Sequence, residues 1–465
     1  IILGKGQIAF GNDGNSLVET NIEGIPSEET RAVFGGTDDE DNSGILKYVS
    51  IRHGGAALAP GDEINGLTLG AVGSGTVIDH IEVFANDDDG IEWFGGAVEV
   101  KHAVVSFCGD DSYDYDFGWR GKGQFWFTLQ GESADNAGEH DGAKPDGEAP
   151  YSKPTIYNAT YIGSGSSSDA KNSTAIHMRD ATAGTYANSI FTDFANEAIE
   201  IEDLAADKGV DSRQRAEDGE LLLLNNIWHN FGAGSSWEDI VRGTSGGEDS
   251  TGAWLEAIIE ATWENAIEDP ELEMIDRTAT GKCNPVPTFG GAAYTNLADY
   301  PEDAFFEVVN YKGAFGGSNW AEGWTALSNM GYFDEEAPVV GANEVIIKDG
   351  DLTGTITASW TKDNTYILDG FVFLEEGGVL NIEAGTVIKA LESPTTGDNA
   401  SAMIISRGAT INAAGTSESP IIFTSELDDV TDAADLTHED KGLWGGLIIL
   451  GKGQIAFGND GNSLV

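Results

Sequence analysis

The sequence is poor in cysteine and has no long apolar run. Cys108 and Cys283 are its two cysteines among 465 residues, which excludes a disulfide scaffold and predicts free, buried thiols. A membrane-spanning helix needs about 18 or more apolar residues in succession. The longest apolar runs here, such as 221–224 and 447–450, have the length of a strand. Nothing in the sequence is therefore expected to cross a membrane.

Basic residues are also scarce. The chain has 24 Lys and Arg against 79 Asp and Glu, and a formal net charge of −55. This balance excludes nucleic acid as a partner, because phosphate binding needs concentrated positive charge. Such a charge also opposes compaction unless cations neutralise part of it. Two interpretations remain, bound divalent cations or a solvated acidic surface like that of halophiles, and the clustering of the acids favours cations for part of the charge.

The chain repeats itself at its ends. IILGKGQIAFGNDGNSLV occupies residues 1–18 and again residues 448–465, a period of 447 residues. Because self-similarity at a fixed period is typical of repeat architectures, we expect a tandem array or a fibre of near-identical units. The alternatives are a circularly permuted chain and an error in sequence assembly.

Short β-branched runs separated by Gly, Asn and Asp dominate the sequence. They are four to six residues long, as at 379–382, 402–406 and 420–425, which suits strands joined by turns. Similar segments recur: 65–69 matches 89–93 after 24 residues, 81–84 matches 104–107 after 23, and Asp87-Asp88 matches Asp110-Asp111 after 23. Coils of this size predict an all-β fold, a right-handed parallel β-helix whose rungs stack about 4.8 Å apart.

The rungs predict which side chains form the core. We expect Leu67, Leu69, Ile78, Ile81 and Val83 to point inward, and Thr68, Asp79 and Glu82 to face water. One short external helix is predicted near 252–273, where apolar residues follow helical spacing up to Pro270. The loop-rich, aromatic stretch 283–333 is expected to cap an end of the coil.

The pattern also predicts the domain boundaries. We expect 1–337 to form the main part of a β-helix unit, with the helix and the cap. A linker or unit boundary is expected at 338–343. Residues 344–465 then form the opening rungs of the next unit, or of the same permuted unit.

Several segments carry a resemblance to a known family. GGVLNIEAGTVIK (377–389) and DDGIEWFGG (88–96) are among them, with 406–409, 420–425, 444–448, 22–26, 48–55, 63–69, 107–111, 121–126, 138–142 and 324–327. The chain resembles a family of bacterial secreted right-handed parallel β-helix surface proteins, whose members are described as lipoproteins or as carrying a secretion-sorting domain. The family order places 343–465 before 19–342, which agrees with a permuted or tandem arrangement. The resemblance implies an extracellular β-helix and no particular reaction.

Three acidic clusters are candidate calcium sites. Their carboxylates belong to Asp38, Asp39 and Asp41; Asp87, Asp88 and Asp89; and Asp110, Asp111, Asp114 and Asp116. The last two clusters are expected on adjacent rungs, where close like charges disfavour ionisation unless a cation intervenes. Calcium accepts six to eight oxygens, including those of turns. Solvated turn aspartates are the simpler alternative.

The sequence also contains residues that suit catalysis or carbohydrate binding. Asp110 and Asp111 would be acid and base, with Asp114, Arg120 and His140 nearby, although the full constellation of a β-helix hydrolase does not occur in order. The aromatic residues Trp93, Trp119, Phe125, Trp126 and Phe127 suit either a sugar platform or a core. His80 and His102 would stack on adjacent rungs, where a sheet surface explains them more simply than a metal.

Together these patterns predict an extracellular or cell-surface structural or adhesive β-helix. Its units would join end to end into a filament, because open coil ends expose unpaired strand groups, and calcium would stabilise it. The chain itself and an extracellular polysaccharide are the expected partners. A calcium-dependent polysaccharide lyase or hydrolase and a carbohydrate-binding module are the alternatives.

Overall fold

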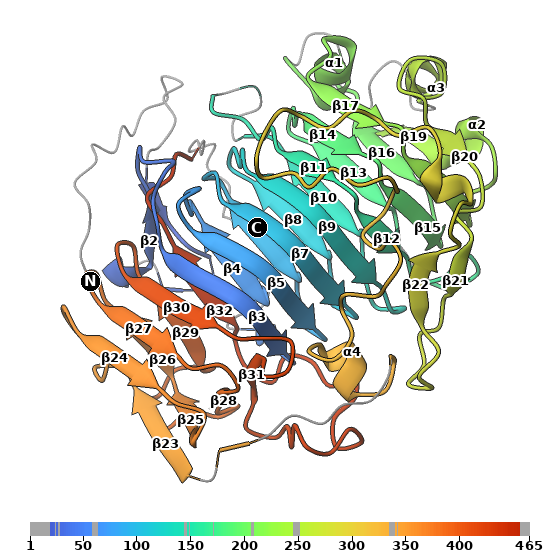
Figure 1. Ribbon diagram of the computed structural model, residues 1–465. Coiled ribbons are helices and arrows are strands. Elements are labelled where there is room, and N and C mark those ends of the chain that lie inside the picture. The colour runs from blue at the N-terminus through green and yellow to red at the C-terminus, as the bar shows by residue number, and fades with distance from the viewer. Residues whose placement is uncertain are drawn as a thin grey trace.

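A computed structural model describes residues 19–455, except 24, 27, 58–63, 144–146, 148, 171, 206–208, 245–251, 334–339 and 342. The chain winds into a parallel β-helix with three sheets, as the sequence predicts. In Figure 1 the strands of the C-terminal part, in orange and red, are followed along the coil by blue, cyan and green ones. The first copy of the terminal repeat lies outside the described residues, as do 456–465 of the second copy and Pro338, Val339 and Ala342 of the predicted boundary.

Sheet A is a single ladder of ten strands. In spatial order these are β26 (Phe371–Leu374), β29 (Ala402–Ile405), β32 (Leu447–Leu450), β4 (Leu67–Gly70), β6 (Ile91–Phe94), β8 (Tyr113–Asp116), β10 (Gly138–Asp141), β13 (Ile176–Arg179), β16 (Ile199–Glu202) and β19 (Val241–Thr244). Because β32 pairs with β4 in parallel register, the rungs of the C-terminal part continue directly into those of the N-terminal part.

Sheets B and C share four long strands that bend from one sheet into the other. These are β3 (Gly44–Arg52), β5 (Val77–Phe84), β7 (Glu99–Ser106) and β9 (Lys122–Leu129). Sheet B adds β24 (Thr357–Trp360), β27 (Val379–Ile382), β30 (Thr410–Ala414), β11 (Thr155–Tyr157), β14 (Gly184–Ala187) and β17 (Leu221–Leu224). Sheet C adds β23 (Asn343–Lys348), β25 (Asn364–Asp369), β28 (Val387–Ala390), β31 (Ile421–Ser425), β12 (Thr160–Ile162), β15 (Ile190–Phe194), β18 (Ile227–Phe231) and β20 (Ala266–Ile267).

The bend between sheets B and C needs a left-handed backbone residue on each rung. Tyr48, His80, His102 and Phe125 occupy it in the long strands, at φ between 47° and 60°. Asn158, Asn188 and Asn225 occupy it on later rungs, at φ between 53° and 57°. Asparagine adopts this region more readily than most residues, which explains the choice on the later rungs.

The core contains the residues predicted to point inward. Leu67, Leu69, Ile78, Ile81 and Val83 are all buried in it. Large aromatic rings stack through the same core: Trp93 lies 5.1 Å from Trp126 and 4.8 Å from Trp119 between ring centroids. The sugar platform is therefore wrong for these tryptophans and for Phe125 and Phe127, because all five side chains are buried.

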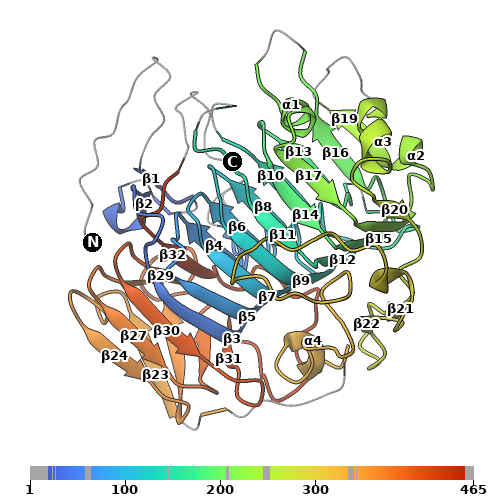
Figure 2. The ribbon, with the colours of Figure 1, turned by 45° about the horizontal axis from the view of Figure 1, so that its top comes forward.

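Several sequence expectations need correction. The helix predicted at 252–273 is α3 (Ala253–Ile259), and the chain beyond Glu260 leaves the helix before Pro270. Figure 2 shows α3 beside α1 (Ser212–Glu217) and α2 (Trp237–Ile240) at the end of the coil near β19. Its Leu255 and Ile259 enter the core, so this helix covers that end. Among the described residues no helix is long and apolar enough to cross a membrane.

The loop-rich stretch runs along the side of the coil rather than over an end. This flanking segment (residues 288–333) follows the hairpin of β21 (Leu272–Met274) and β22 (Asn284–Pro287) and contains α4 (Ala326–Asn329). The corner asparagines hold it: Asn158 donates to the Tyr311 carbonyl over 2.9 Å and Asn188 to the Ala298 carbonyl over 3.0 Å. Glu82, expected to face water, is fully buried beneath α4, and Thr68 is buried as well.

Candidate carboxylate site

The outer surface of sheet A is divided into an apolar half and a charged half. Side chains of the first rungs, including Phe373, Ile404 and Ile448, are covered by residues 19–35, which contain β1 (Glu19–Asn21) and β2 (Val33–Gly35). From β6 onward the same row becomes ionisable. Strand pairing aligns one position on successive rungs, which holds Glu92, Asp114, Glu139, His177, Glu200 and Arg242 in turn.

A second row of acids lies where the chain enters sheet A. Asp89 and Asp111 hold equivalent positions: Asp89 Oδ1 accepts from the Asp111 backbone N over 2.9 Å, and Asp111 Oδ1 accepts from the Asn136 backbone N over 2.5 Å. Each carboxylate thus caps the next rung with one oxygen. The sequence predicts a step of 23 residues between these two rungs. The observed step is one residue shorter, since Ile81 pairs with Ala103 and Ile91 with Tyr113.

These two rows merge into a continuous carboxylate site. Three overlapping triads have oxygens within 4.8 Å of one another: Asp88, Asp89 and Asp110; Asp89, Glu92 and Asp114; and Asp110, Asp111 and Asp135. We call these seven residues the carboxylate site. Glutamate, like aspartate, offers only acceptor oxygens when ionised, so the site can bind cations but has no hydrogen-bond donor until it is protonated.

Burial and mutual repulsion change the acidity of the site. Burial, followed by the charge of Asp88, raises the pKa of Asp89 well above its usual value. The pKa values of Glu92, Asp111 and Asp114 are raised in the same way, by burial and then by Glu23 in the first case and Glu139 in the other two. Asp114 Oδ1 is buried without a hydrogen-bond partner. The site therefore favours a bound proton or a bound cation over a set of bare carboxylates.

The positive side chains on this sheet are already paired. Arg179 bonds Glu139 over 2.6 Å and Asp141 over 2.8 Å. Arg242 bonds Glu197 over 2.9 Å and Glu200 over 2.6 Å. These bridges neutralise the later rungs, so the excess negative charge is concentrated around Asp89 and Asp114.

The structure brings together five of the ten predicted metal-binding aspartates: Asp88, Asp89, Asp110, Asp111 and Asp114. Asp116 lies at the opposite end of β8, where its Oδ1 accepts from the Phe117 backbone N over 2.5 Å. Asp87 is exposed and lies beside Lys441, whose positive charge it stabilises.

The cluster at 38–41 does not form a comparable site. Both Asp39 oxygens are bound by Arg120, at 2.9 and 3.0 Å, and also by Gln454. Asp41 accepts from Ser43 over 3.3 Å, and Asp38 from the Glu40 backbone N over 3.1 Å. These contacts stabilise a loop, and the three carboxylates form no triad in the part of the chain that the structure describes.

The alternative catalytic set does not assemble. His140 points into the core, stacked 4.0 Å from Tyr115, and its Nε2 bonds the Tyr186 hydroxyl over 2.8 Å. Burial lowers the pKa of His140 to about 3. Since Arg120 is occupied by Asp39, neither residue is available to Asp110 and Asp111.

Sequence reasoning missed Glu92 and Asp135 as members of the site, and Glu139 beside it. Glu92 alternates with the inward Ile91 and Trp93 in the segment IEWF, a period-2 signal that places it outward. Asp135 and Glu139 lie one rung later, after a spacing that differs from the preceding one, so a fixed period does not find them.

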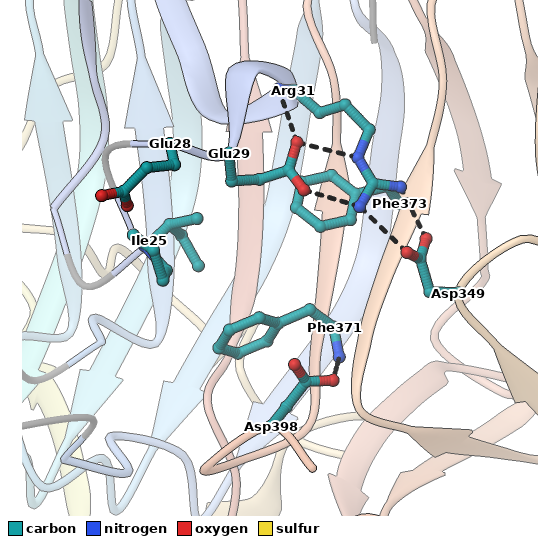
Figure 3. Close-up of a pocket in the computed structure, with 9 residues that line it drawn as sticks. Ile25, Glu28, Glu29, Arg31, Asp349, Phe371, Phe373 and Asp398 are labelled. Atoms are coloured by element: carbon teal, nitrogen blue, oxygen red, sulfur yellow. Dashed lines mark hydrogen bonds and ion pairs between the residues drawn. The ribbon is translucent and has the colours of Figure 1, made fainter. Parts of the chain in front are cut away.

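A separate pocket of about 330 Å³ opens on the apolar half, lined by residues of 25–31 and by Asp349, Phe371, Phe373 and Asp398. Figure 3 shows Arg31 between Glu29 and Asp349, 2.7 Å from an oxygen of each, with its guanidinium 3.9 Å above the Phe373 ring. Asp398 accepts from the Phe371 backbone N over 3.1 Å. Because its guanidinium is occupied on both edges, Arg31 fastens residues 19–35 to the first rungs.

Comparison with known proteins agrees with the parallel β-helix fold. A family model described as a pectate-lyase like beta helix domain matches residues 1–244 and 350–465. Neither a curated protein nor a solved structure matches the chain.

Proposed function

We propose that this chain, which belongs to the family of pectate-lyase-like β-helix domains, binds an acidic polysaccharide through calcium held at the carboxylate site. The observation that carries the proposal is Asp114, whose buried Oδ1 has no partner inside a cluster of raised-pKa carboxylates. A cation would supply that partner. The family supports a polysaccharide as the ligand. Because the site is negatively charged, an acidic polysaccharide would bind to it through a cation.

Charge makes the cation necessary for this ligand. A chain with a net charge of −55 repels an acidic polymer, and the carboxylate site is among its most negative regions. Calcium takes six to eight oxygen ligands and accepts them from more than one molecule. The triads supply three protein oxygens each, and the uronate groups of the polymer would complete the coordination.

The pairing of the two arginines on sheet A favours binding over cleavage. A lyase needs a basic side chain free to take a proton from the sugar, whereas Arg179 and Arg242 are both held in ion pairs. We therefore propose a carbohydrate-binding role, with the extracellular space or the cell surface as the location, where acidic polysaccharides and calcium are both present.

The test is calorimetric titration of polygalacturonate into the calcium-loaded and chelator-treated protein. We expect binding only with calcium, and a loss of more than about 100-fold in calcium affinity for Asp114→Asn, because a direct ligand counts for more than the outer-shell partners whose loss costs about 10- to 100-fold. Glu302→Gln, an exposed acid outside the site, is the matched control. Equal binding of the polymer with and without calcium would contradict the proposal. Release of cleaved or unsaturated sugar during the titration would show a lyase or hydrolase activity in addition to binding.

A second candidate is the adhesive filament. At the end opposite α3, strands β23 and β24 are the outermost of their sheets, and Ile346 on β23 is 59 % exposed. Unpaired strand edges of this kind favour stacking on another chain. Electron microscopy and light scattering of the protein in calcium would then detect end-to-end assemblies. The filament would be contradicted if the parent chain stayed monomeric at every concentration and Ile346→Lys gave the same light scattering as the parent chain.

A further inference from the structure

A cluster at the corner of sheets B and C combines two histidines with one aspartate. His80 and His102 occupy the bend of β5 and β7, and their rings stack 4.1 Å apart between centroids. The stack continues to Tyr48 on the rung before and to Phe125 on the rung after, at 4.2 and 5.0 Å. The two imidazoles are thus held parallel by an aromatic ladder that spans four rungs.

Asp79 joins the two histidines at one oxygen. Its Oδ1 lies 2.9 Å from His80 Nδ1 and 2.8 Å from His102 Nδ1. Its Oδ2 lies 3.5 Å from Lys47 Nζ, which fixes the carboxylate and leaves Oδ1 to the rings. Among the described residues this is the one candidate metal cluster that contains nitrogen donors.

The surroundings shield the cluster without closing it. Trp320 and Trp324 of the flanking segment pack edge-on against His80, at 5.6 and 5.9 Å, and Trp320 lies 4.9 Å from His102. The imidazoles keep 14 % and 16 % of their surface exposed, and Asp79 keeps 27 %. An ion can therefore reach the donors and would then lie in a mostly dry environment.

The contacts within the cluster change the acidity of two of its three groups. Burial raises the pKa of Asp79, but the hydrogen bonds from His102 and His80 outweigh burial and lower this pKa well below its usual range. Burial also lowers the pKa of His102. Both Nδ1 atoms donate to Asp79 Oδ1, because an ionised carboxylate only accepts. A metal ion bound at these nitrogens would take the place of the two protons.

We propose that Asp79, His80 and His102 form a binding site for a first-row transition-metal ion, with Zn²⁺ as the best fit. Zinc takes His nitrogen and carboxylate oxygen at about 2.0–2.2 Å, and the two N···O contacts are short enough for one ion to replace the shared hydrogen bonds. Two imidazoles select against calcium and magnesium, which prefer oxygen. Three protein ligands leave a fourth tetrahedral position to water.

This site is independent of the carboxylate site and would act on the flanking segment. The ion would tie β5 to β7 directly beneath Trp320 and Trp324, which dock the segment onto the corner. Zinc binding is therefore expected to stabilise the docked segment. The calcium-dependent binding of polysaccharide would remain unchanged.

The test uses the whole chain after removal of metals, titrated with ZnCl₂ by calorimetry with calcium in excess, so that the carboxylate site is occupied. We expect one Zn²⁺ per chain. His102→Phe places at the corner the residue that Phe125 already provides one rung later, and should lower zinc affinity by more than about 100-fold, beyond the loss typical of outer ligands. His229→Phe, a histidine on β18 outside the cluster, should bind zinc like the parent chain.

A second readout and a second variant make the result decisive. Co²⁺ in the site should give a visible absorption band typical of tetrahedral nitrogen and oxygen ligands, and Zn²⁺ should abolish it. If His102→Phe does not fold, Asp79→Asn removes the charged ligand and is expected to lose the band. Zinc binding that is equally tight in the parent chain and in a folded cluster variant would overturn the proposal, as would the absence of binding to the parent chain.

Discussion

At the scale of single residues, buried carboxylates play two opposite roles. Glu82 is fully buried, but both of its carboxylate oxygens have hydrogen-bond donors. They accept from the Ala326 backbone N at 2.7 and 2.9 Å, and one also accepts from the Ser50 hydroxyl over 2.5 Å. Asp114 is surrounded by other carboxylates and keeps an oxygen without a partner. The first arrangement fastens α4, whereas the second leaves binding capacity for a cation.

Glu82→Gln tests the fastening role. The substitution removes the negative charge that accepts from the Ala326 backbone N and the Ser50 hydroxyl and that stabilises the buried Arg52, and a hydrogen bond to a charged group typically contributes about 1.5–3 kcal/mol. We expect a loss of that size in the free energy of unfolding by urea, with earlier proteolysis within 288–333. Glu302→Gln, at an exposed position, should change stability by less than about 0.5 kcal/mol. Equal stability of both variants would contradict the role.

At the scale of elements, the sequence predicted the rungs better than their surroundings. Period-2 alternation and turn residues were enough to identify the strands and the inward positions, because these depend on neighbours along the chain. The burial of Glu82 was not predictable in this way, because it depends on α4, more than 240 residues away. The aromatic core was ambiguous for a related reason: a tryptophan in a strand suits either face until the register is known.

The junction between β30 and β3 is the element that links the C-terminal rungs to the N-terminal ones. Gly44 lies there at φ +119°, and a Cβ at this position would meet the Ile411 carbonyl oxygen at 1.8 Å. We expect Gly44→Ala to lower the free energy of unfolding by more than about 3 kcal/mol, among the larger single-residue effects. Gly350→Ala, at φ +96° with open space around it, should cost only the backbone strain of about 1–2 kcal/mol.

The comparison of these two variants isolates the close approach between rungs. Both carry a positive φ, so a large difference in their free energies of unfolding reports mainly the clash. If Gly44→Ala were no less stable than Gly350→Ala, the parallel pairing of β3 with β30 would not be present in solution.

At the scale of the whole molecule, charge and architecture are linked. A coil stacks equivalent turns above one another, so acids that recur in the sequence become neighbours in space, as Asp88 and Asp89 do with Asp110 and Asp111. Recurrent aspartates predicted that cluster from sequence. The spacing could not predict Asp135, because the turn before it is longer, nor the occupation of Asp39 by Arg120 and Gln454.

The same stacking predicts how stability depends on pH and calcium. Asp89, Glu92, Asp111 and Asp114 have raised pKa values in the folded chain, so the folded state binds more protons than the unfolded one above the ordinary carboxyl pKa of about 4. Acidification of the calcium-free protein from neutral pH to about pH 5 should therefore add stability through these four groups. The buried His102 and His140 act in the opposite direction, because their lowered pKa values favour protonation of the unfolded chain. Below about pH 4 the unfolded chain is protonated as well and the gain ends.

Calcium should replace the proton at neutral pH. With calcium in excess the melting temperature at neutral pH should rise, since calcium, like the proton, relieves the repulsion among the carboxylates. Asp114→Asn should raise the melting temperature of the calcium-free protein at neutral pH, because it removes one of the repelling charges, and should reduce the effect of calcium. Scanning calorimetry of both chains with calcium and with chelator measures each difference. If Asp114→Asn did not raise the melting temperature of the calcium-free protein at neutral pH, these carboxylates would be ionised without cost, and calcium would then have no repulsion to relieve there.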